Sequence, residues 1–418
     1  YVSNILEDPD ADIENVSLGA NNLSDFSWKQ LLDSVSCTEC ARCTTVCPAS
    51  RTDKPLSPMK IITDIRHKLY AETLNLNNYD GALVGGLISE TELWSCTTCG
   101  ACMEECPVLI EHVPTITDMR RHLVLSEGKP PEQSSESLEK TLQNGNPWGM
   151  PQHERAKWAE DFNLDLPTLA DKKEVDVLYW VGCAGSYDPR NQGIARDLVT
   201  ILKNANIDFA ILGKEETCTG DSARRLGEEY LFETLAKQNI ETLNKYKFNT
   251  VITACPHCFQ VISKEYKDFG GDYNVVHHSQ YIQELIDNEK IRVGETLDGT
   301  ITYHDACYLG RYNDIYEAPR SIIESLLSDK GEIVEMKDNK SGSLCCGAGG
   351  GNMWHEIPEG DRINIKRFEQ AIDSQADTVA TACSFCAIMM EDAKNVTGNE
   401  NKMQTLDIAE LVANSLDK

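Results

Sequence analysis

Residues 37–48 read Cys37-Thr-Glu-Cys40-Ala-Arg-Cys43-Thr-Thr-Val-Cys47-Pro48, and residues 96–107 read Cys96-Thr-Thr-Cys99-Gly-Ala-Cys102-Met-Glu-Glu-Cys106-Pro107. Three thiolates at this spacing hold three irons of a [4Fe–4S] cubane from one loop, while a fourth thiolate comes from elsewhere. In chains with two such runs, the fourth cysteine of each run ligates the cluster of the other run. The spacing therefore predicts one cluster on Cys37, Cys40, Cys43 and Cys106, and a second cluster on Cys96, Cys99, Cys102 and Cys47.

Zinc and disulfides are the alternative interpretations of these two runs. Zinc sites are typically built from two Cys-x2-Cys pairs, not from a triple run that closes with Cys-Pro. The 17 cysteines among 418 residues are too few for a disulfide-stabilised scaffold. Their clustering instead favours metal binding in a reducing compartment, which predicts a cytoplasmic location.

The chain is strongly acidic. It has 39 basic and 67 acidic residues, which give a formal net charge of −28. Nucleic acid is therefore not expected as a partner, because no basic surface is available to neutralise its phosphates. The acidity has two interpretations, general solubility and a docking surface for a basic redox partner.

Composition and periodicity divide the first 174 residues into three regions. An acidic, extended lead-in is followed by a region with helical spacing around the two cysteine runs, most clearly at residues 57–70 and 115–125. A connector rich in Pro, Ser and Glu comes next, with a turn-forming stretch at residues 146–151. We place these regions at residues 1–27, 28–125 and 126–174.

From residue 175 onward, strand-like and helical segments alternate. Short runs rich in β-branched and aromatic residues predict strands at 175–181, 209–212, 250–254 and 300–304, and a helical pattern covers 193–204. Such alternation predicts parallel α/β domains, which we place at residues 175–299 and 300–418. The fold class is therefore α+β multidomain, with an all-helical N-terminal module followed by two α/β domains.

The two α/β regions repeat each other. Residues 250–258 return as residues 378–386 at an offset of 128, and the same offset relates Cys218 to Cys346. At the place of Cys345, however, the first copy has Thr217. The second copy thus holds five cysteines, which are Cys307, Cys345, Cys346, Cys383 and Cys386. The first copy holds four, which are Cys183, Cys218, Cys255 and Cys258. We expect the copies to face each other about a pseudo-twofold axis.

The five-cysteine pattern followed by Gly347 resembles the CCG domain of heterodisulfide reductases and related iron–sulfur oxidoreductases. The whole layout from Trp28 onward, a dicluster ferredoxin module followed by two CCG domains, resembles the D-type subunit of heterodisulfide reductase. It is equally similar to the iron–sulfur reductases that pair with electron-transfer flavoprotein and menaquinone, and to iron–sulfur subunits of anaerobic glycerol-3-phosphate and glycolate or lactate oxidation. The segments 145–149, 218–221 and 345–351 strengthen the resemblance.

The resemblance implies that the complete cysteine set holds a non-cubane [4Fe–4S] cluster at the catalytic or terminal site. Carried over residue by residue, this cluster falls on Cys307, Cys345, Cys346, Cys383 and Cys386. The glycines from Gly347 to Gly351 allow the backbone to approach the inorganic sulfides and to donate N–H bonds. Because Thr217 breaks the pattern, the four cysteines of the first copy stay open to a cubane, to zinc or to no metal.

The resemblance also predicts the function. We expect an iron–sulfur oxidoreductase subunit that carries electrons between a flavoprotein or dehydrogenase and a quinone-linked membrane partner, in a hetero-oligomer. The alternatives are a heterodisulfide reductase-type subunit that reduces or forms a disulfide, and a scaffold whose CCG domains mainly bind a partner. The chain begins with Tyr1 and not Met, and it contains no signal peptide and no apolar stretch of 18 residues. We therefore expect that the chain is trimmed, and the question of a membrane segment upstream stays open. We expect a peripheral position on the inner face of the membrane.

Overall fold

The computed structural model describes residues 18–74, 81–399 and 402–416. Most of the predicted acidic lead-in, residues 1–17, lies outside the described residues. The chain forms two compact units that are discontinuous in sequence. The first unit contains Tyr1–Glu136, Ser222–Glu233 and Gly347–Ile363, and the second contains Ser137–Asp221, Thr234–Cys346 and Asn364–Lys418.

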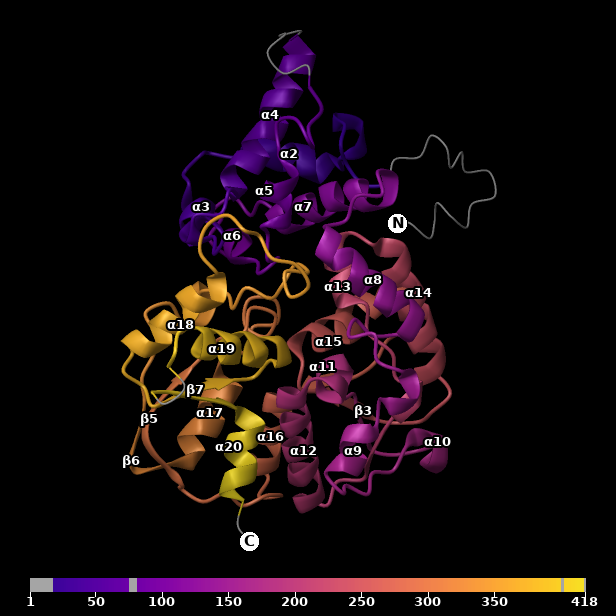
Figure 1. The fold of residues 1–418 in the computed structure, drawn as a ribbon, viewed down its shortest axis with the longest axis vertical. Coiled ribbons are helices and arrows are strands. Elements are labelled where there is room, and N and C mark those ends of the chain that lie inside the picture. The colour runs from indigo at the N-terminus through magenta and orange to yellow at the C-terminus, as the bar shows by residue number, and fades with distance from the viewer. Residues whose placement is uncertain (1–17, 75–80, 400–401, 417–418) are drawn as a thin grey trace. The chain divides into compact units, whose positions relative to one another are not determined.

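The cysteine runs of the first unit lie among short helices (Figure 1). Helix α4 packs against α2 and α7, and the equivalent short helices α3 and α6 pack against each other. This last contact brings the two cysteine runs together. The helices are α2 (Trp28–Ser36), α3 (Arg42–Val46), α4 (Pro58–Leu74), α5 (Glu90–Trp94), α6 (Ala101–Glu104) and α7 (His112–Arg121).

The two helices predicted here are present. Helix α4 covers the predicted segment 57–70 except for its first residue, and it begins with Pro58 in the first turn, where a missing N–H is tolerated. Its buried side chains include Ile61, Ile62 and Ile65, which lie on one helical face. The second predicted segment, 115–125, is divided between α7 and a π-helical turn, η4 (His122–Ser126).

Two four-stranded parallel sheets form the centre of the second unit. Their strand orders are β2-β1-β3-β4 and β6-β5-β7-β8, so each sheet places its first strand between its second and third. The identical order confirms the predicted repeat of two α/β domains. The strands are β1 (Val177–Tyr179), β2 (Phe209–Ile211), β3 (Thr250–Thr253), β4 (Val275–His277), β5 (Leu297–Tyr303), β6 (Leu327–Ile333), β7 (Thr378–Thr381) and β8 (Gln404–Asp407).

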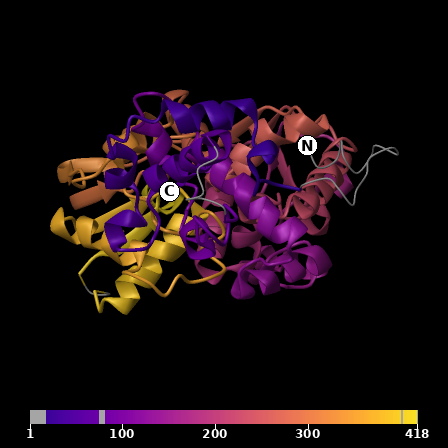
Figure 2. The same ribbon diagram turned by 90° about the horizontal axis from the view of Figure 1, so that it is seen from above.

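Helices join the two halves of the second unit in a reciprocal way. Helix α12 follows the first strand of its sheet and packs on α20, which follows the last strand of the other sheet. The equivalent pair, α17 and α16, makes the same contact with the roles exchanged, as a pseudo-twofold axis requires. Figures 1 and 2 show the halves as separate lobes, magenta to salmon and orange to yellow. These helices are α12 (Pro189–Asn204), α16 (His278–Asp287), α17 (Glu317–Leu326) and α20 (Ile408–Ser415).

The remaining helices cover the sheets and form the connector. The connector was predicted from its composition and its turn at residues 146–151, and the structure adds three helices to it, α8 (Glu132–Asn144), α9 (Lys157–Asp161) and α10 (Leu169–Lys172). Within the described residues, none of the helices combines the length and the apolar composition needed to cross a membrane. The others are α11 (Gly182–Tyr187), α13 (Asp221–Leu226), α14 (Glu229–Leu243), α15 (Pro256–Gln260), α18 (Ile363–Asp373) and α19 (Ser384–Val396).

Candidate iron–sulfur sites

The two cysteine loops of the first unit share one backbone conformation. Glu39 and Ala41 have φ angles of 54° and 60°, and Thr98 and Gly100, 59 positions later, have φ angles of 49° and 76°. Left-handed residues are uncommon outside glycine, so their recurrence at equivalent positions marks a shape that both loops need. This shape curls each loop so that three successive cysteines turn toward one space.

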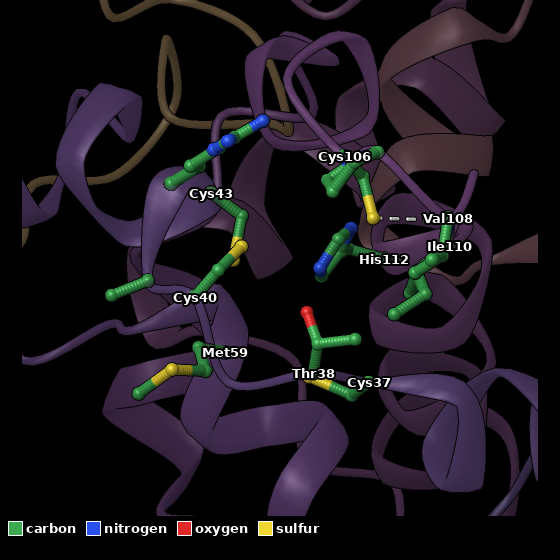
Figure 3. Close-up of a pocket in the computed structure, with 12 residues that line it drawn as sticks. Cys37, Thr38, Cys40, Cys43, Met59, Cys106, Val108, Ile110 and His112 are labelled. Atoms are coloured by element: carbon green, nitrogen blue, oxygen red, sulfur yellow. Dashed lines mark hydrogen bonds between the residues drawn. The ribbon is translucent and has the colours of Figure 1, made fainter.

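The first predicted ligand set is brought together. Cys37, Cys40, Cys43 and Cys106 line one pocket, although Cys106 belongs to the other run (Figure 3). The backbone N–H of Ile110 donates to Cys106 Sγ at 3.3 Å. Four thiols from two loops around one space, with an amide N–H on one sulfur, fit the donor set of a cubane.

The second predicted ligand set is also brought together, again with its fourth member from the other run. Burial and then the charges of Cys99 and Cys96 raise the pKa of Cys47 to about 12. Burial and the charges of Cys96, Cys99 and Cys47 raise the pKa of Cys102 well above its usual value. Buried thiolates this close repel one another unless a cation lies between them, so the donor set fits a bound metal.

A buried arginine of α7 holds the second cysteine run in place. Arg120 is 0% exposed, and its guanidinium donates to the carbonyl oxygens of Leu93 at 2.6 Å and Cys96 at 2.7 Å. It also donates to the carbonyl of Arg225 at 2.8 Å and to that of Gly350 at 2.9 Å. Arg120 therefore joins three sequence-distant segments of the first unit.

The glycines after Cys346 allow a close approach of backbones within the first unit. A Cβ atom on Gly349 would lie 2.3 Å from the carbonyl oxygen of Thr97, and one on Gly350 would lie 2.2 Å from that of Cys96. Any side chain here would displace the loop that carries the second cysteine run. Their predicted contact with inorganic sulfide stays a prediction, but packing alone already requires glycine at these positions.

The five cysteines of the complete set are all buried in the second unit. Cys386 Sγ donates to Cys346 Sγ at 3.3 Å, and Cys383 is a hydrogen-bonding neighbour of Cys386. Cys307 follows β5 and Cys383 follows β7, and because these strands are parallel neighbours, both cysteines emerge at the same sheet edge. Cys345 precedes Cys346 directly.

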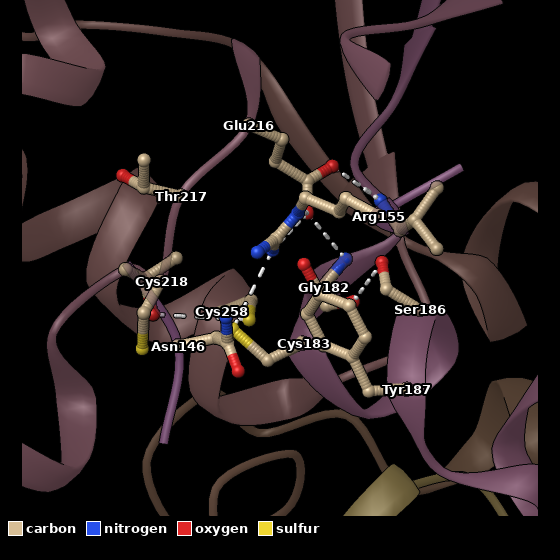
Figure 4. A network of polar contacts seen from close by, with 12 residues as sticks. Asn146, Arg155, Gly182, Cys183, Ser186, Tyr187, Glu216, Thr217, Cys218 and Cys258 are labelled. Atoms are coloured by element: carbon tan, nitrogen blue, oxygen red, sulfur yellow. Dashed lines mark hydrogen bonds and ion pairs between the residues drawn. The ribbon is translucent and has the colours of Figure 1, made fainter. Parts of the chain in front are cut away.

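The four-cysteine set of the first copy has a different environment, and Figure 4 shows three of its members, Cys183, Cys218 and Cys258. Arg155, from the connector, donates through Nη2 to Cys183 Sγ at 3.4 Å and to Glu216 Oε1 at 2.7 Å. Glu216 also accepts from the backbone N–H groups of Val181 at 3.0 Å and Gly182 at 2.8 Å. Both ion-pair side chains are 1% exposed.

Thr217, which stands where the second copy has Cys345, is held by a neighbouring helix. Its hydroxyl donates to Asn239 Oδ1 at 2.8 Å, and Asn239 Nδ2 donates to the carbonyl of Cys218 at 2.9 Å. Cys183 has Cys218 as its hydrogen-bonding neighbour, and Cys255 has Cys258. Cys258 also lies close enough to Cys183 and Cys218 for their charges to raise its pKa, so the four thiols are gathered in one place, while Thr217 is engaged in a structural bond.

The two Cys-x2-Cys loops meet within the second unit. His257 and Phe385 are equivalent residues of the repeat, and their rings lie 5.1 Å apart. The His257 ring also stacks on Tyr308, with ring centroids 4.1 Å apart. Although burial opposes its protonation, the Asp221 carboxylate, 2.8 Å from Nδ1, raises the pKa of His257 to about 10. Aromatic and imidazole rings thus lie where the two loops meet.

The sequence pattern indicates the cysteines of these candidate sites but not their polar partners. Arg155, Glu216, Asn239 and Arg367 are buried polar residues that contact a cysteine or a neighbour of one. Glu216 offered a weak signal, because it lies two residues before Cys218. The others are distant in sequence from their partners and offered none.

Comparison with known proteins defines the class of this protein. A 4Fe–4S dicluster domain model matches residues 33–110, and a cysteine-rich domain model, CCG, matches residues 177–263 and 301–391. The chain is 30% identical over 401 residues to the D subunit of the dihydromethanophenazine:CoB–CoM heterodisulfide reductase of Methanosarcina barkeri, with 93% of this chain and 95% of that protein covered. The chain therefore belongs to the CCG-domain iron–sulfur oxidoreductases that include this relative, as its resemblance predicted.

Two bacterial relatives are more similar in sequence. The chain is 38% identical over 440 residues to the probable iron-sulfur-binding oxidoreductase FadF of Bacillus subtilis, and 35% identical over 439 residues to an EtfAB:quinone oxidoreductase of Syntrophomonas wolfei. These matches cover 96% and 97% of this chain, but 62% and 61% of the relatives. The chain thus spans about three fifths of the length of these two proteins.

Proposed function

We propose that this chain carries electrons between two cubane [4Fe–4S] clusters and one non-cubane [4Fe–4S] cluster, as a subunit of an oxidoreductase complex. The cubanes would be held by Cys37, Cys40, Cys43 and Cys106, and by Cys96, Cys99, Cys102 and Cys47. The non-cubane cluster would be held by Cys307, Cys345, Cys346, Cys383 and Cys386. The observation that carries the proposal is the crossed grouping of the two cysteine runs, which spacing alone had predicted.

The residues around the cysteines support this role. Such clusters, when bound, supply one-electron transfer at potentials set by burial and by hydrogen bonds to sulfur. Cys96, Cys99, Cys102 and Cys106 are buried, which excludes water, and the N–H groups of Thr98 and Ile110 donate to cysteine sulfurs at 3.4 and 3.3 Å. Cys40 is exposed, so the first set reaches the surface of its unit. A surface cluster suits exchange of electrons with another protein.

We infer that the partners are a flavoprotein or dehydrogenase and a quinone-linked membrane protein. The name of one relative includes EtfAB and quinone, and another relative, from Chromohalobacter salexigens, is named a probable membrane-anchored ferredoxin. The net charge of −28 supports a partner with a basic docking face. We accordingly propose a hetero-oligomer that acts at the inner face of the membrane.

A heterodisulfide reductase-type reaction is the second candidate. The observation that favours it is the match to the D subunit of heterodisulfide reductase, which covers 95% of that relative. In this case the complete cysteine set would act at a substrate disulfide. Turnover of a disulfide with a reduced viologen would support this candidate, whereas reduction of a quinone analogue by a reduced flavoprotein would support electron transfer.

Iron and sulfide quantification with EPR on the purified protein tests the cluster assignment. We expect about 12 irons per chain, which corresponds to two cubanes and one further cluster. About 8 irons would limit the proposal to the two cubanes, and about 16 would add a cluster on Cys183, Cys218, Cys255 and Cys258. Zinc in the same analysis would assign these four cysteines to a zinc site. A colourless, iron-free protein would refute the proposal.

A further inference from the structure

His304 lies beside the complete cysteine set but is not one of its predicted ligands. It follows the last residue of β5 and precedes Cys307 by three positions. One ring nitrogen of His304 and the sulfurs of Cys346 and Cys386 all lie within 4.8 Å of one another. The side chain is 1% exposed, and Nε2 has no hydrogen-bond partner in the part of the chain that the structure describes.

Arg367 determines which nitrogen of His304 carries the proton. Arg367 Nε donates to His304 Nδ1 at 2.9 Å. An arginine Nε always bears hydrogen and cannot accept, so Nδ1 must offer its lone pair. A neutral imidazole with an accepting Nδ1 has its proton on Nε2. His304 is therefore fixed as an Nε2–H donor.

The arginine itself is held firmly. Arg367 is 0% exposed, and its Nη1 donates to the Asp338 carbonyl and to Gln370 Oε1, both at 2.7 Å. Burial lowers its pKa to about 10, so it remains protonated at neutral pH. These contacts of Arg367, which lies on α18, thus fix the orientation of its Nε–H toward His304.

We propose that His304 donates an N–H···S hydrogen bond to the sulfur cluster held by the complete cysteine set, and that Arg367 is the positioning residue that enforces this role. The inference rests on the proposed cluster at Cys307, Cys345, Cys346, Cys383 and Cys386. It assigns His304 to the second coordination sphere and not to iron. An N–H donor stabilises the added negative charge of the reduced cluster, so His304 raises the midpoint potential.

Iron ligation by His304 is the main alternative, and the geometry disfavours it. Ligation through Nε2 requires the proton on Nδ1, where it would oppose the Arg367 N–H. The repeat supports the same conclusion. The residue equivalent to His304 in the first copy is Trp180, which is 0% exposed and whose Nε1–H has no partner among the described residues. An indole N–H donates but does not ligate metal, so the position carries an N–H donor in both copies.

Pulsed EPR on the reduced wild-type holoprotein is the primary test. We expect the signal of the additional cluster to show a weak coupling to nitrogen that changes with ¹⁵N-histidine labelling, and a coupled proton that exchanges in D2O. A strong nitrogen coupling, typical of direct ligation, would overturn the inference. Absence of any histidine coupling would overturn it as well, while the cluster assignment would stand. Absence of the additional cluster signal would overturn both.

Three variants provide the second test, which is an EPR-monitored redox titration. H304F removes the donor while it keeps a ring of similar size, and we expect the midpoint potential of the additional cluster to become more negative. H304Q supplies an amide N–H, and we expect a smaller shift. R367M removes the hydrogen bond that fixes the tautomer of His304, and we expect the midpoint potential to shift in the same direction as in H304F. The two cubane potentials serve as internal controls.

The matched control is W180F in the first copy, for which we expect an unchanged potential of the additional cluster. An unchanged potential in both H304F and R367M, with the cluster retained, would contradict the inference. The wild-type spectra decide between donor and ligand even for a variant that does not take up the cluster.

Discussion

The two CCG halves of this molecule share a strand order and the positions of four cysteines, yet they surround these cysteines with different chemistry. The second half adds a fifth cysteine, Cys345, and a histidine held by Arg367. The first half has Thr217, Trp180 and Asn239 in place of Cys345, His304 and Arg367. It also contains a buried ion pair between Arg155 and Glu216. The first half therefore has one thiolate fewer, and a buried ion pair lies beside its Cys183.

The first half lacks the fifth cysteine, and the residues around that position differ between the halves as well. Glu216 of the first half corresponds to Leu344 of the second, and Asn239 corresponds to Arg367. The first half can satisfy Thr217 because Asn239 accepts its hydroxyl proton. A single substitution at position 217 would consequently not convert one half into the other.

The largest expected effect is the loss of a cluster. C345S removes the thiolate that only the second half possesses, and we expect iron to fall from about 12 to about 8 per chain, together with the additional EPR signal. The matched control is T217S, which keeps a hydroxyl for Asn239 and should leave the iron content unchanged. Equal iron in wild type and C345S would show that the fifth cysteine does not distinguish the halves.

The next effect concerns the buried ion pair that Arg155 and Glu216 form beside Cys183. R155M leaves the Glu216 carboxylate buried without its cation, which should cost about 3–5 kcal/mol in the free energy of unfolding, measured from urea midpoints. R155M/E216L installs the leucine of the second half and should recover only part of this loss, because it removes the unpaired charge but leaves the backbone N–H groups of Val181 and Gly182 without their acceptor.

The control for this experiment is R190M, which breaks the more exposed pair between Arg190 and Glu410. The loss in R190M should be clearly smaller than in R155M, because solvent compensates the remaining charge. A loss in R155M no larger than that in R190M would argue against a structural role of the buried pair.

A pH effect should arise from the segment that follows Cys346. His355 is 7% exposed, and burial together with the nearby charge of Arg120 lowers its pKa to about 4. The unfolded chain, with a histidine pKa of about 6.5, takes up the proton first as the pH falls. Stability should therefore fall between about pH 6.5 and pH 4, by about 3 kcal/mol in total for this group.

The variant H355F should remove this contribution and reduce the slope of stability against pH in that window. Wild type and H355F should then differ in slope between pH 4 and 6.5 but not above pH 7. Parallel curves across the whole range would contradict the assignment. His355 lies in the first unit, and the equivalent position of the first copy is Gly227, so the first copy lacks this titrating group.

The smallest expected effect is at Thr217 itself. T217V removes the hydroxyl that donates to Asn239, which should destabilise the fold by about 1–2 kcal/mol. The control is T302V, because Thr302 is also buried and its hydroxyl has no hydrogen-bond partner in the described part of the chain. T302V should be neutral or slightly stabilising. Equal losses in the two variants would indicate a packing effect instead.

Local pattern predicted much of this structure. The cysteine spacing predicted that the fourth cysteine of each run joins the other run in the first unit, because ligand geometry depends on a few neighbouring residues. Helix α4 and strands β1, β2, β3 and β5 followed from hydrophobic periodicity, which is also a local property. The 128-residue offset revealed two domains of the same strand order.

Long-range partners were not predictable in this way. Arg155 lies in a connector whose composition indicated only turns, and its ion pair with Glu216 joins residues 61 positions apart. Arg367 and His304 are 63 positions apart. Such pairs depend on which helix packs over which strand end, and the periodicity of either segment contains no information about the other.

The contacts of Arg120 have a consequence for biosynthesis. This residue binds the carbonyls of Leu93 and Cys96, and also those of Arg225 and Gly350, which the ribosome adds more than a hundred and more than two hundred residues later. Domains usually fold in the order of their synthesis. Here the N-terminal module reaches its full set of contacts only after most of the chain has emerged, so its final closure should be a late event in maturation.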